Sequence, residues 1–459
     1  MKNQSINRLT LIFLLIGIFF LFFLPPTDPD LGWQLRCGQQ IWQERKICSH
    51  NEFSVLLENY YWPDARFLYQ LPLFLFYQIF GVFGLSLINS LLMLASFFLF
   101  LSLLGRKEIK IISLPFLILF SWLVFSFGIR NQLISFFFLF LLLKLIELGN
   151  QNKKWLFFSP LVMSLWANSH GGFILGVILL LIFLFEKTVW LIINHRQFKN
   201  YLFIFVFVLL SISATLLNPF GYQVYFENWR HFSTVPLAHL IAEWVPPHPW
   251  FQVVILLFLA IAFGAVYQTR KQLLTIFKFL GLIAFAYLAL KARRNLAFFF
   301  FFAGYVIAFI KVKSKYIKPL ALLAAMTIFF FGFFLILPKT IMVNRSWPPS
   351  CQITHSCQAI EFLKKQSEKN LPTSSHRAET DGKAGNIFNT YEQGGLLIWL
   401  LPEYKVFVDG RMPAWRTPSD KSPYTIYLET LQTRPGWQGT LEKYKIDWLY
   451  IGPGPFMDL

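Results

Sequence analysis

The chain has 459 residues, with 41 Lys and Arg against 23 Asp and Glu and a formal net charge of +18. Hydrophobic residues make up 56% of it and charged residues only 14%, whereas a soluble domain carries about 25% charged residues. So many apolar side chains, 55 of them Phe, exclude an ordinary soluble protein and predict one embedded in a membrane. Four Cys and 25 Gly are too few for a disulfide scaffold or a collagen.

Apolar runs follow one another along most of the chain, and we count eleven that approach the roughly 20 residues needed to cross a bilayer. They are 9–24, 84–104, 111–128, 132–148, 155–168, 172–193, 201–217, 250–268, 273–290, 296–310 and 319–337. Runs 111–128 and 132–148 are either two spans or one re-entrant hairpin. The stretch 67–83 is counted as loop, with a dip into the membrane as the alternative. The first run ends in LPPTDPD without a small-residue cleavage site, so we expect an uncleaved anchor.

The basic residues predict the orientation of these spans. The N-terminus and the connections around GRKEIK, NQNKK, NHRQFKN, TRKQ and KVKSKYIK carry a net charge of +15, against +1 for the opposite connections and +2 for residues 338–459. The positive-inside rule places the first side in the cytoplasm. An odd number of spans then places the tail outside, in a multi-pass protein of the cell membrane.

Two regions differ in composition, and we predict a multispanning membrane domain over 1–337, with an outer loop at 25–83, and an extracytoplasmic α/β domain over 338–459. In the tail, CQAIEFLKKQ has helical spacing, and GNIFN, KVFVDG and IDWLYIG are typical of short buried strands between helical segments. This alternation favours a partly parallel sheet. The fold class is therefore a polytopic α-helical membrane protein of about 11 transmembrane helices with a C-terminal extracytoplasmic α/β domain.

All four cysteines fall in segments predicted to lie outside. Short-range disulfides Cys37–Cys48 and Cys351–Cys357 are compatible with an oxidising exterior, and four unpaired thiols are the equally weighted alternative.

Two motifs of the tail each allow a functional and a structural interpretation. Gly394 and Gly395 either cradle a phosphate or, by preference, serve packing or a turn. Asp409-Gly410-Arg411 follows a strand end and either contacts a ligand or forms an ion pair.

The outer loop opens on Asp28-Pro29-Asp30, immediately after the first span. Two neighbouring carboxylates can share a cation or divide into a base and a stabiliser, because close like charges separate their pKa values. Asp64 lies in the same loop. Between them, residues 31–45 have near-helical apolar spacing, which predicts either a helix half buried in lipid headgroups or a plain surface helix.

Polar residues also gather at the predicted outer ends of the spans. Such groups are costly at membrane depth and usually face a protein interior or an aqueous cavity, so together they predict one outward-facing pocket. Arginine suits phosphate because its planar guanidinium donates two parallel hydrogen bonds. The candidate substrate-binding residues are Asp64, Arg130, Gln132, His170, Glu243, Arg293 and Arg294.

With these residues in hand, the chain resembles the GT-C superfamily of membrane glycosyltransferases, and a group of bacterial multispanning proteins related to it. The resemblance rests on the order of DPDLGWQLRCGQQI, YYWPDARFLYQ, RNQLISFFF, LWANSHGGFILG, LLNPFGYQVY with EWVPP, ARRNLAFF and YKVFVDGR. Two positions depart from that group: Gln34 stands where His is usual, and Asn131 where Pro is frequent.

The resemblance implies transfer of a sugar from a polyprenyl-phosphate carrier lipid to an acceptor on the outer membrane face. It implies an acidic residue of the first outer loop as catalytic base, here Asp28 or Asp30, with arginines facing the leaving phosphate. The superfamily includes enzymes with and without a divalent cation, so the cofactor stays open. Membrane lipids are the other expected partners.

Two alternatives remain: a lipid-linked glycan transporter or ligase-like protein, and a non-catalytic membrane scaffold. A transporter is expected to show inverted repeats or broken helices near the bilayer midplane, and the sequence has no convincing repeat. Nucleic-acid binding is disfavoured because the basic residues are scattered over six cytoplasmic segments rather than gathered on one face.

Overall fold

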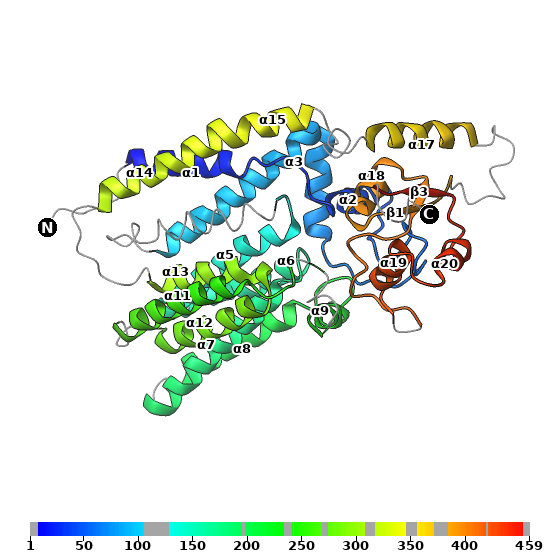
Figure 1. Ribbon diagram of the computed structural model, residues 1–459. Coiled ribbons are helices and arrows are strands. Elements are labelled where there is room, and N and C mark those ends of the chain that lie inside the picture. The colour runs from blue at the N-terminus through cyan, green and yellow to red at the C-terminus, as the bar shows by residue number, and fades with distance from the viewer. Residues whose placement is uncertain are drawn as a thin grey trace. The chain divides into compact units, whose positions relative to one another are not determined.

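The computed structural model describes residues 8–104, 128–194, 198–233, 241, 243–268, 274–307, 317–345, 356–370, 384–418 and 421–452. The chain forms two compact units, which we describe one at a time (Figure 1). Unit 1 comprises residues 1–24, 86–224 and 235–341, and unit 2 comprises 25–85, 225–234 and 342–459. Unit 2 thus groups the predicted outer loop with the tail, across the predicted boundary at residue 338.

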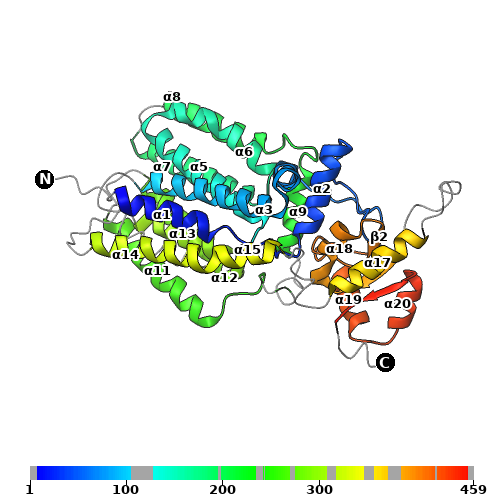
Figure 2. The same ribbon diagram turned by 90° about the horizontal axis from the view of Figure 1, so that it is seen from above.

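Unit 1 consists of helices. They are α1 (Arg8–Leu21), the second part of α3 (Phe67–Leu103), η2 (Asn131–Leu133), α5 (Ile134–Gln151), η3 (Lys153–Phe158), α6 (Ser159–Ala167), α7 (Phe173–Asn194), α8 (Phe198–Ala214), α11 (Pro249–Gln268), α12 (Thr275–Lys291), η4 (Arg293–Asn295), α13 (Leu296–Ile307), α14 (Ile317–Phe330), the π-helical segment η5 (Phe331–Ile336) and α15 (Leu337–Arg345), whose end enters unit 2. Figure 2 shows α1 running beside α14, and these two helices pack on one another.

Phenylalanine forms the core of unit 1. All twelve residues of α13 are buried. The ring of Phe301 lies 4.5–6.1 Å, between centroids, from those of Phe97, Phe100, Phe136 and Phe140. Because aromatic pairs at such distances attract beyond their buried area, the Phe-rich composition serves helix packing as well as lipid contact.

Five helices of the described residues are long and apolar enough to cross a membrane: Phe67–Leu103, Asn131–Gln151, Phe173–Ile193, Pro249–Gln268 and Leu322–Arg345. Arg8–Leu21 and Phe198–Ala214 are shorter apolar helices. Run 111–128 lies outside the described residues except for its last one, and the count of about eleven stays a prediction.

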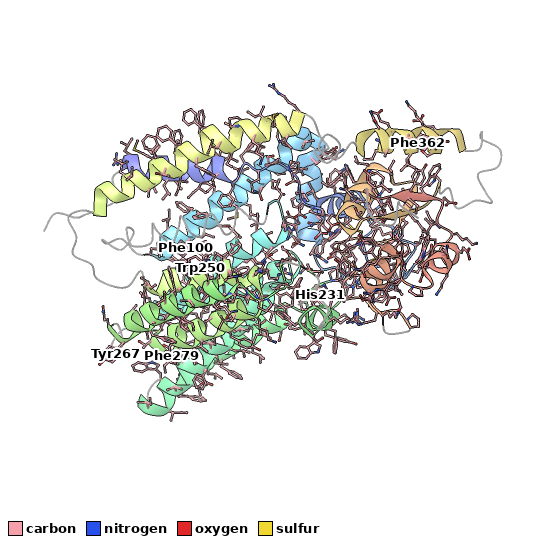
Figure 3. The ribbon with its side chains drawn as sticks, viewed as in Figure 1. Phe100, His231, Trp250, Tyr267, Phe279 and Phe362 are labelled. Atoms are coloured by element: carbon pink, nitrogen blue, oxygen red, sulfur yellow. A yellow bond between two sulfur atoms is a disulfide. The ribbon has the colours of Figure 1, made fainter. Side chains whose placement is uncertain are left out.

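Aromatic side chains mark both ends of α11. Trp250 and Tyr267 are 64% and 67% exposed, and Figure 3 labels both. Seventeen residues at 1.5 Å each separate them by roughly 26 Å, close to the hydrocarbon thickness of a bilayer. Trp and Tyr favour the two membrane–water interfaces, so this helix has the length and the end residues of a membrane helix.

The treatment of residues 67–83 as loop is wrong, because α3 begins at Phe67. Its first part belongs to unit 2, where Phe74 and Tyr77 pack their rings on Trp399. Tertiary packing therefore stabilises a helix that contains Pro72 in its second turn. The helix kinks at Gly81, whose φ of 58° is readily available only to glycine.

Unit 2 is built on a three-stranded parallel sheet of order β2-β1-β3. Its elements are α2 (Leu31–Gln43), the first part of α3, most of α9 (Gln223–Ser233), α17 (Ser356–Asn370), β1 (Gly385–Asn389), η6 (Tyr391–Gln393), α18 (Gly394–Leu400), β2 (Tyr404–Val406), α19 (Pro423–Leu431), α20 (Trp437–Lys443) and β3 (Trp448–Tyr450). β1 and β3 lie within the predicted segments, whereas β2 begins one residue before KVFVDG and shares only Lys405 and Val406 with it. β2 ends early because the Asn389 side chain, rather than a strand, accepts the Phe407 N–H at 2.9 Å.

The predicted outer loop completes this sheet. Ser54 forms a parallel bridge with Val406, and backbone hydrogen bonds join Val55 N–H to the Val406 carbonyl and Val406 N–H to the Phe53 carbonyl, both at 3.0 Å. One hydrophobic core contains Trp33, Leu56 and Trp62 from the loop together with the strands and helices of the tail. Loop and tail therefore fold as one body.

Candidate active site

The Asp28-Pro29-Asp30 turn leads directly into α2. The Asp28 Oδ1 accepts the backbone N–H of Asp30 at 2.9 Å, a local turn that short acidic side chains favour. Trp33, one helical turn on, donates its indole Nε1–H to the Asp30 Oδ1 at 3.2 Å. The first of the two predicted catalytic carboxylates is thus bonded within the turn, and the second to the helix that follows.

Helix α2 is buried along the face predicted to lie in lipid headgroups. Leu31, Leu35 and Gly38 are inside unit 2, and the disulfide Cys37–Cys48 ties the helix to the following loop. This confirms the first of the two predicted disulfides, while Cys351 lies outside the described residues. Leu31, Leu35 and Gly38 pack against protein rather than lipid headgroups, and Trp42 is the exposed member of the predicted apolar stripe.

Three sequence motifs meet at the start of α2. A Cβ atom on Gly395 would overlap the Pro29 carbonyl, and one on Gly32 would overlap the Gly395 carbonyl. A Cβ on Gly410 would overlap the Asp30 Oδ1. The Gly394-Gly395 pair therefore serves close packing rather than a phosphate cradle, and the Asp409-Gly410-Arg411 turn lies against the Asp28-Pro29-Asp30 turn.

Asp409 and Arg411, for which the sequence allows either ligand contact or an ion pair, form a buried ion pair. The guanidinium donates Nε–H to Asp409 Oδ1 and Nη2–H to Oδ2, both at 2.7 Å, and both side chains are fully buried. Burial acts to raise the pKa of Asp409, but the charge and hydrogen bonds of Arg411 outweigh it and hold that pKa below its usual value.

This ion pair reaches across to the outer loop. Arg411 Nη2 also contacts Asn51 Oδ1 at 3.0 Å and Ser54 Oγ at 3.1 Å, and Ser54 donates its hydroxyl to Asp409 Oδ2 at 2.8 Å. The remaining Arg411 nitrogen, Nη1, is buried without a hydrogen-bond partner in the described part of the chain. The guanidinium is instead surrounded by the rings of Phe53, Trp62 and Trp415, a favourable cation–π setting.

Asp64 is bonded to residues that follow it closely in the sequence. It pairs with Arg66 and accepts a hydrogen bond from Gln70 Nε2 at 2.7 Å, and its side chain is fully buried. The Arg66 guanidinium lies 5.0 Å from the ring centroids of both Trp33 and Trp62. Asp64 is thus linked, through Arg66 and Trp33, to Asp30, and its place in the structure is that of a support for that carboxylate.

The structure brings most of the candidate residues of unit 1 together. Arg130 pairs with Glu243, and Arg294 Nη1 lies 3.5 Å from the other Glu243 oxygen. The Gln132 amide donates to the Arg294 carbonyl at 3.1 Å, and the Arg294 guanidinium lies over the Trp244 ring. Each of the three charged side chains is 20–30% exposed.

Two further candidates border this cluster. Arg293 donates its backbone N–H to Val245 and its Nε–H to the Pro246 carbonyl, which places it beside Glu243 along the chain. His170 lies on another connection, where Ser135 Oγ contacts its Nδ1 at 2.7 Å and Gly172 N–H donates to the same nitrogen at 3.0 Å. Trp166 Nε1–H donates to the same Ser135 Oγ at 2.9 Å, so the three side chains form one hydrogen-bonded chain.

The start of α5 joins these connections. Arg130, Gln132 and Ser135 follow one another there, and they bond respectively to Glu243, the Arg294 carbonyl and His170. Four predicted outer connections therefore meet at one end of unit 1. Three arginines against one glutamate give this end an excess of positive charge.

Some functional contacts had no distinctive signal in the sequence. Ser54, Asn51 and Ser135 are ordinary loop or helix-start residues, and only their partners reveal them. Gly410 carried a usable signal, since a glycine between an acidic and a basic residue at a strand end marks a close backbone approach. No group of three or more metal-ligating side chains gathers in the described ranges.

Apolar helices of membrane-spanning length indicate a membrane protein, and unit 2 adds a three-stranded parallel sheet. The crystal structure of the apo Archaeoglobus fulgidus oligosaccharyltransferase is similar, with a TM-score of 0.61 and 12% sequence identity, covering 95% of this chain and 68% of that one. Likeness at this identity shows a shared fold. No family model and no curated protein sequence matches the chain.

Proposed function

We propose that the protein is an inverting GT-C-type glycosyltransferase, which moves a sugar from a polyprenyl-phosphate lipid to an acceptor on the outer membrane face. The observation that carries the proposal is the Asp28-Pro29-Asp30 turn. It directly follows the first apolar helix, in a chain whose fold resembles an oligosaccharyltransferase over 95% of its length. Two carboxylates at a membrane exit, held by neighbouring groups, suit proton abstraction from an acceptor hydroxyl.

The proposed multi-pass topology has three supports. Five long and two shorter apolar helices lie in the described residues, and the net charge of +15 on one set of connections favours a cytoplasmic position for that set. The Cys37–Cys48 disulfide belongs to the same unit as the tail and is typical of an oxidising compartment. We therefore assign unit 2 to the extracytoplasmic side.

The chemistry follows from the charges. Asp28 or Asp30 takes the proton of the acceptor hydroxyl while its oxygen attacks the anomeric carbon, and the bond to the lipid phosphate breaks with inversion. The leaving phosphate gains negative charge. Arginine side chains suit such a charge, and the candidates of this kind in unit 1 are Arg130 and Arg294, which are partly exposed beside Glu243, and Arg293, which lies on the same connection as Arg294.

The test uses full-length protein and a radiolabelled polyprenyl-phosphate sugar. Combining Asp28→Asn with Asp30→Asn is expected to abolish sugar transfer, because neither amide can accept the hydroxyl proton. Glu52→Gln is the matched control: it makes the same change in the same loop, at a partly exposed residue paired with Lys46. Full activity in the double variant would contradict the proposal.

A further inference from the structure

The turn Asp409-Gly410-Arg411 lies against the proposed catalytic carboxylate. The nearest atoms to a Cβ built on Gly410 all belong to the Asp30 side chain, with Oδ1 first, then Cγ and Oδ2. The backbone of Gly410 is outside the left-handed region, so alanine fits its conformation and only the space is lacking. This glycine therefore limits where the Asp30 carboxylate can lie.

The turn is held firmly on its other side. Asp409 and Arg411, on either side of the glycine, form the fully buried ion pair and bond to Asn51 and Ser54 of the outer loop. The Asp409 Oδ1 also accepts the backbone N–H of Arg411 at 3.0 Å, which fixes the turn around Gly410. A methyl group added at residue 410 is thus expected to displace the carboxylate rather than the turn.

The Asp30 carboxylate is held in a defined position by neighbouring residues. Its Oδ1 accepts the indole N–H of Trp33, and the Trp33 ring lies beneath the Arg66 guanidinium that pairs with Asp64. The same Oδ1 is also the atom nearest to the position of a Cβ on Gly410. Two segments more than 300 residues apart in sequence therefore fix one carboxylate oxygen between them.

We propose that Gly410 is a positioning residue for sugar transfer, and that the tail contributes this turn to the transfer site. The inference rests on the proposed function, in which Asp28 or Asp30 is the base, and it assigns the oriented carboxylate to Asp30. A Cβ at residue 410 forces the Asp30 oxygen to move by roughly 1 Å or more to regain contact distance. A displacement of that size at a catalytic group costs about 100-fold in rate.

The experiment compares Gly410→Ala with Gly439→Ala in full-length protein. Gly439 lies in α20 of the same unit, and a Cβ there meets open space. We expect Gly410→Ala to lower kcat about 100-fold with little change in KM for the labelled lipid donor, and Gly439→Ala to leave both unchanged. A kcat for Gly410→Ala within about threefold of the control would overturn the inference.

Thermal midpoints test the contact without any activity. Gly410→Ala is expected to lower the midpoint by roughly 2–4 °C when Asp30 is present, and to have almost no effect in an Asp30→Ala background, where the new methyl group has room. Equal shifts in the two backgrounds would overturn the contact. If the Asp28→Asn, Asp30→Asn variant keeps full activity, the proposed function fails while these midpoints still decide whether Gly410 positions Asp30.

Discussion

The buried Asp409–Arg411 pair predicts a large and unusual loss of stability on replacement of Arg411 by Met. Methionine has nearly the length of arginine and suits the surrounding rings of Phe53, Trp62 and Trp415, so the change removes charge with little change in volume. It leaves Asp409 fully buried, with hydrogen bonds from the Ser54 hydroxyl and from the backbone N–H of residue 411.

Removing one partner of a buried ion pair typically costs 3–5 kcal/mol, because the other charge stays without compensation. Four side-chain hydrogen bonds of 2.7–3.1 Å leave with the guanidinium, two to Asp409 and one each to Asn51 and Ser54. We therefore place the loss in free energy of unfolding at about 3–5 kcal/mol, or roughly 6–20 °C in the midpoint for a unit of this size.

The stability of Arg411→Met is also expected to depend on pH in the opposite direction to that of the native protein. In the native protein the pKa of Asp409 is lowered, so its contribution to stability is present above the unfolded value of 3.8 and is lost as the pH falls through the folded pKa. Without the Arg411 guanidinium, burial is opposed only by the hydrogen bonds from Ser54 and from the backbone N–H of residue 411, and we expect it to raise the pKa of Asp409. Arg411→Met is therefore expected to gain stability between about pH 7 and pH 5, where the native protein gains nothing from this group.

The measurement is thermal unfolding in detergent at pH 7 and pH 5, followed by tryptophan fluorescence, since Trp62 and Trp415 flank the guanidinium. Adding Asp409→Asn to Arg411→Met removes the stranded charge and should recover most of the lost stability. A midpoint for Arg411→Met equal to that of the native protein, or a double variant less stable than the single one, would refute the reasoning.

Two further predictions concern unit 2. Replacing Cys37 and Cys48 together by Ser should destabilise the unit by about 2–4 kcal/mol, measured as a lower unfolding midpoint that the reduced native protein reproduces; unchanged midpoints would contradict it. Burial raises the pKa of Tyr427 to about 12, with smaller effects from the Tyr391 backbone and Glu392. Its neutral form thus contributes stability that is full below pH 10 and lost as the pH rises to 12, so Tyr427→Phe should unfold later than the native protein in an alkaline titration.

The sequence predicts those elements of the fold whose signal is local. The strands predicted at GNIFN and IDWLYIG form within those segments, and the one predicted at KVFVDG forms only over its first two residues, because a short apolar run bounded by turn residues marks a strand better than it marks the strand's ends. Helix α17 buries Ile360 and Leu363 as its spacing indicates. The helix over residues 67–83 has no clear local signal, because its first part packs against Trp399, which is far away in the sequence.

In the candidate site, too, the residues with a local signal in the sequence are the ones that could be predicted. Polarity at the ends of the spans was enough to select Arg130, Gln132, Glu243 and Arg294, and these four residues do gather in unit 1, because a costly polar group near a membrane must find a partner.

The residues that hold Asp30 could be predicted from the sequence only in part. Trp33 lies only three residues from Asp30, so their contact can be predicted from the helical spacing. Gly410 and Ser54 acquire their roles only when the outer loop joins the sheet of the tail. Composition separates loop from tail, whereas the backbone bonds between Phe53, Val55 and Val406 make them one body. A carboxylate fixed from both segments depends on the tail for its position, so a change in the tail's turn acts at Asp30 without altering any residue of the loop.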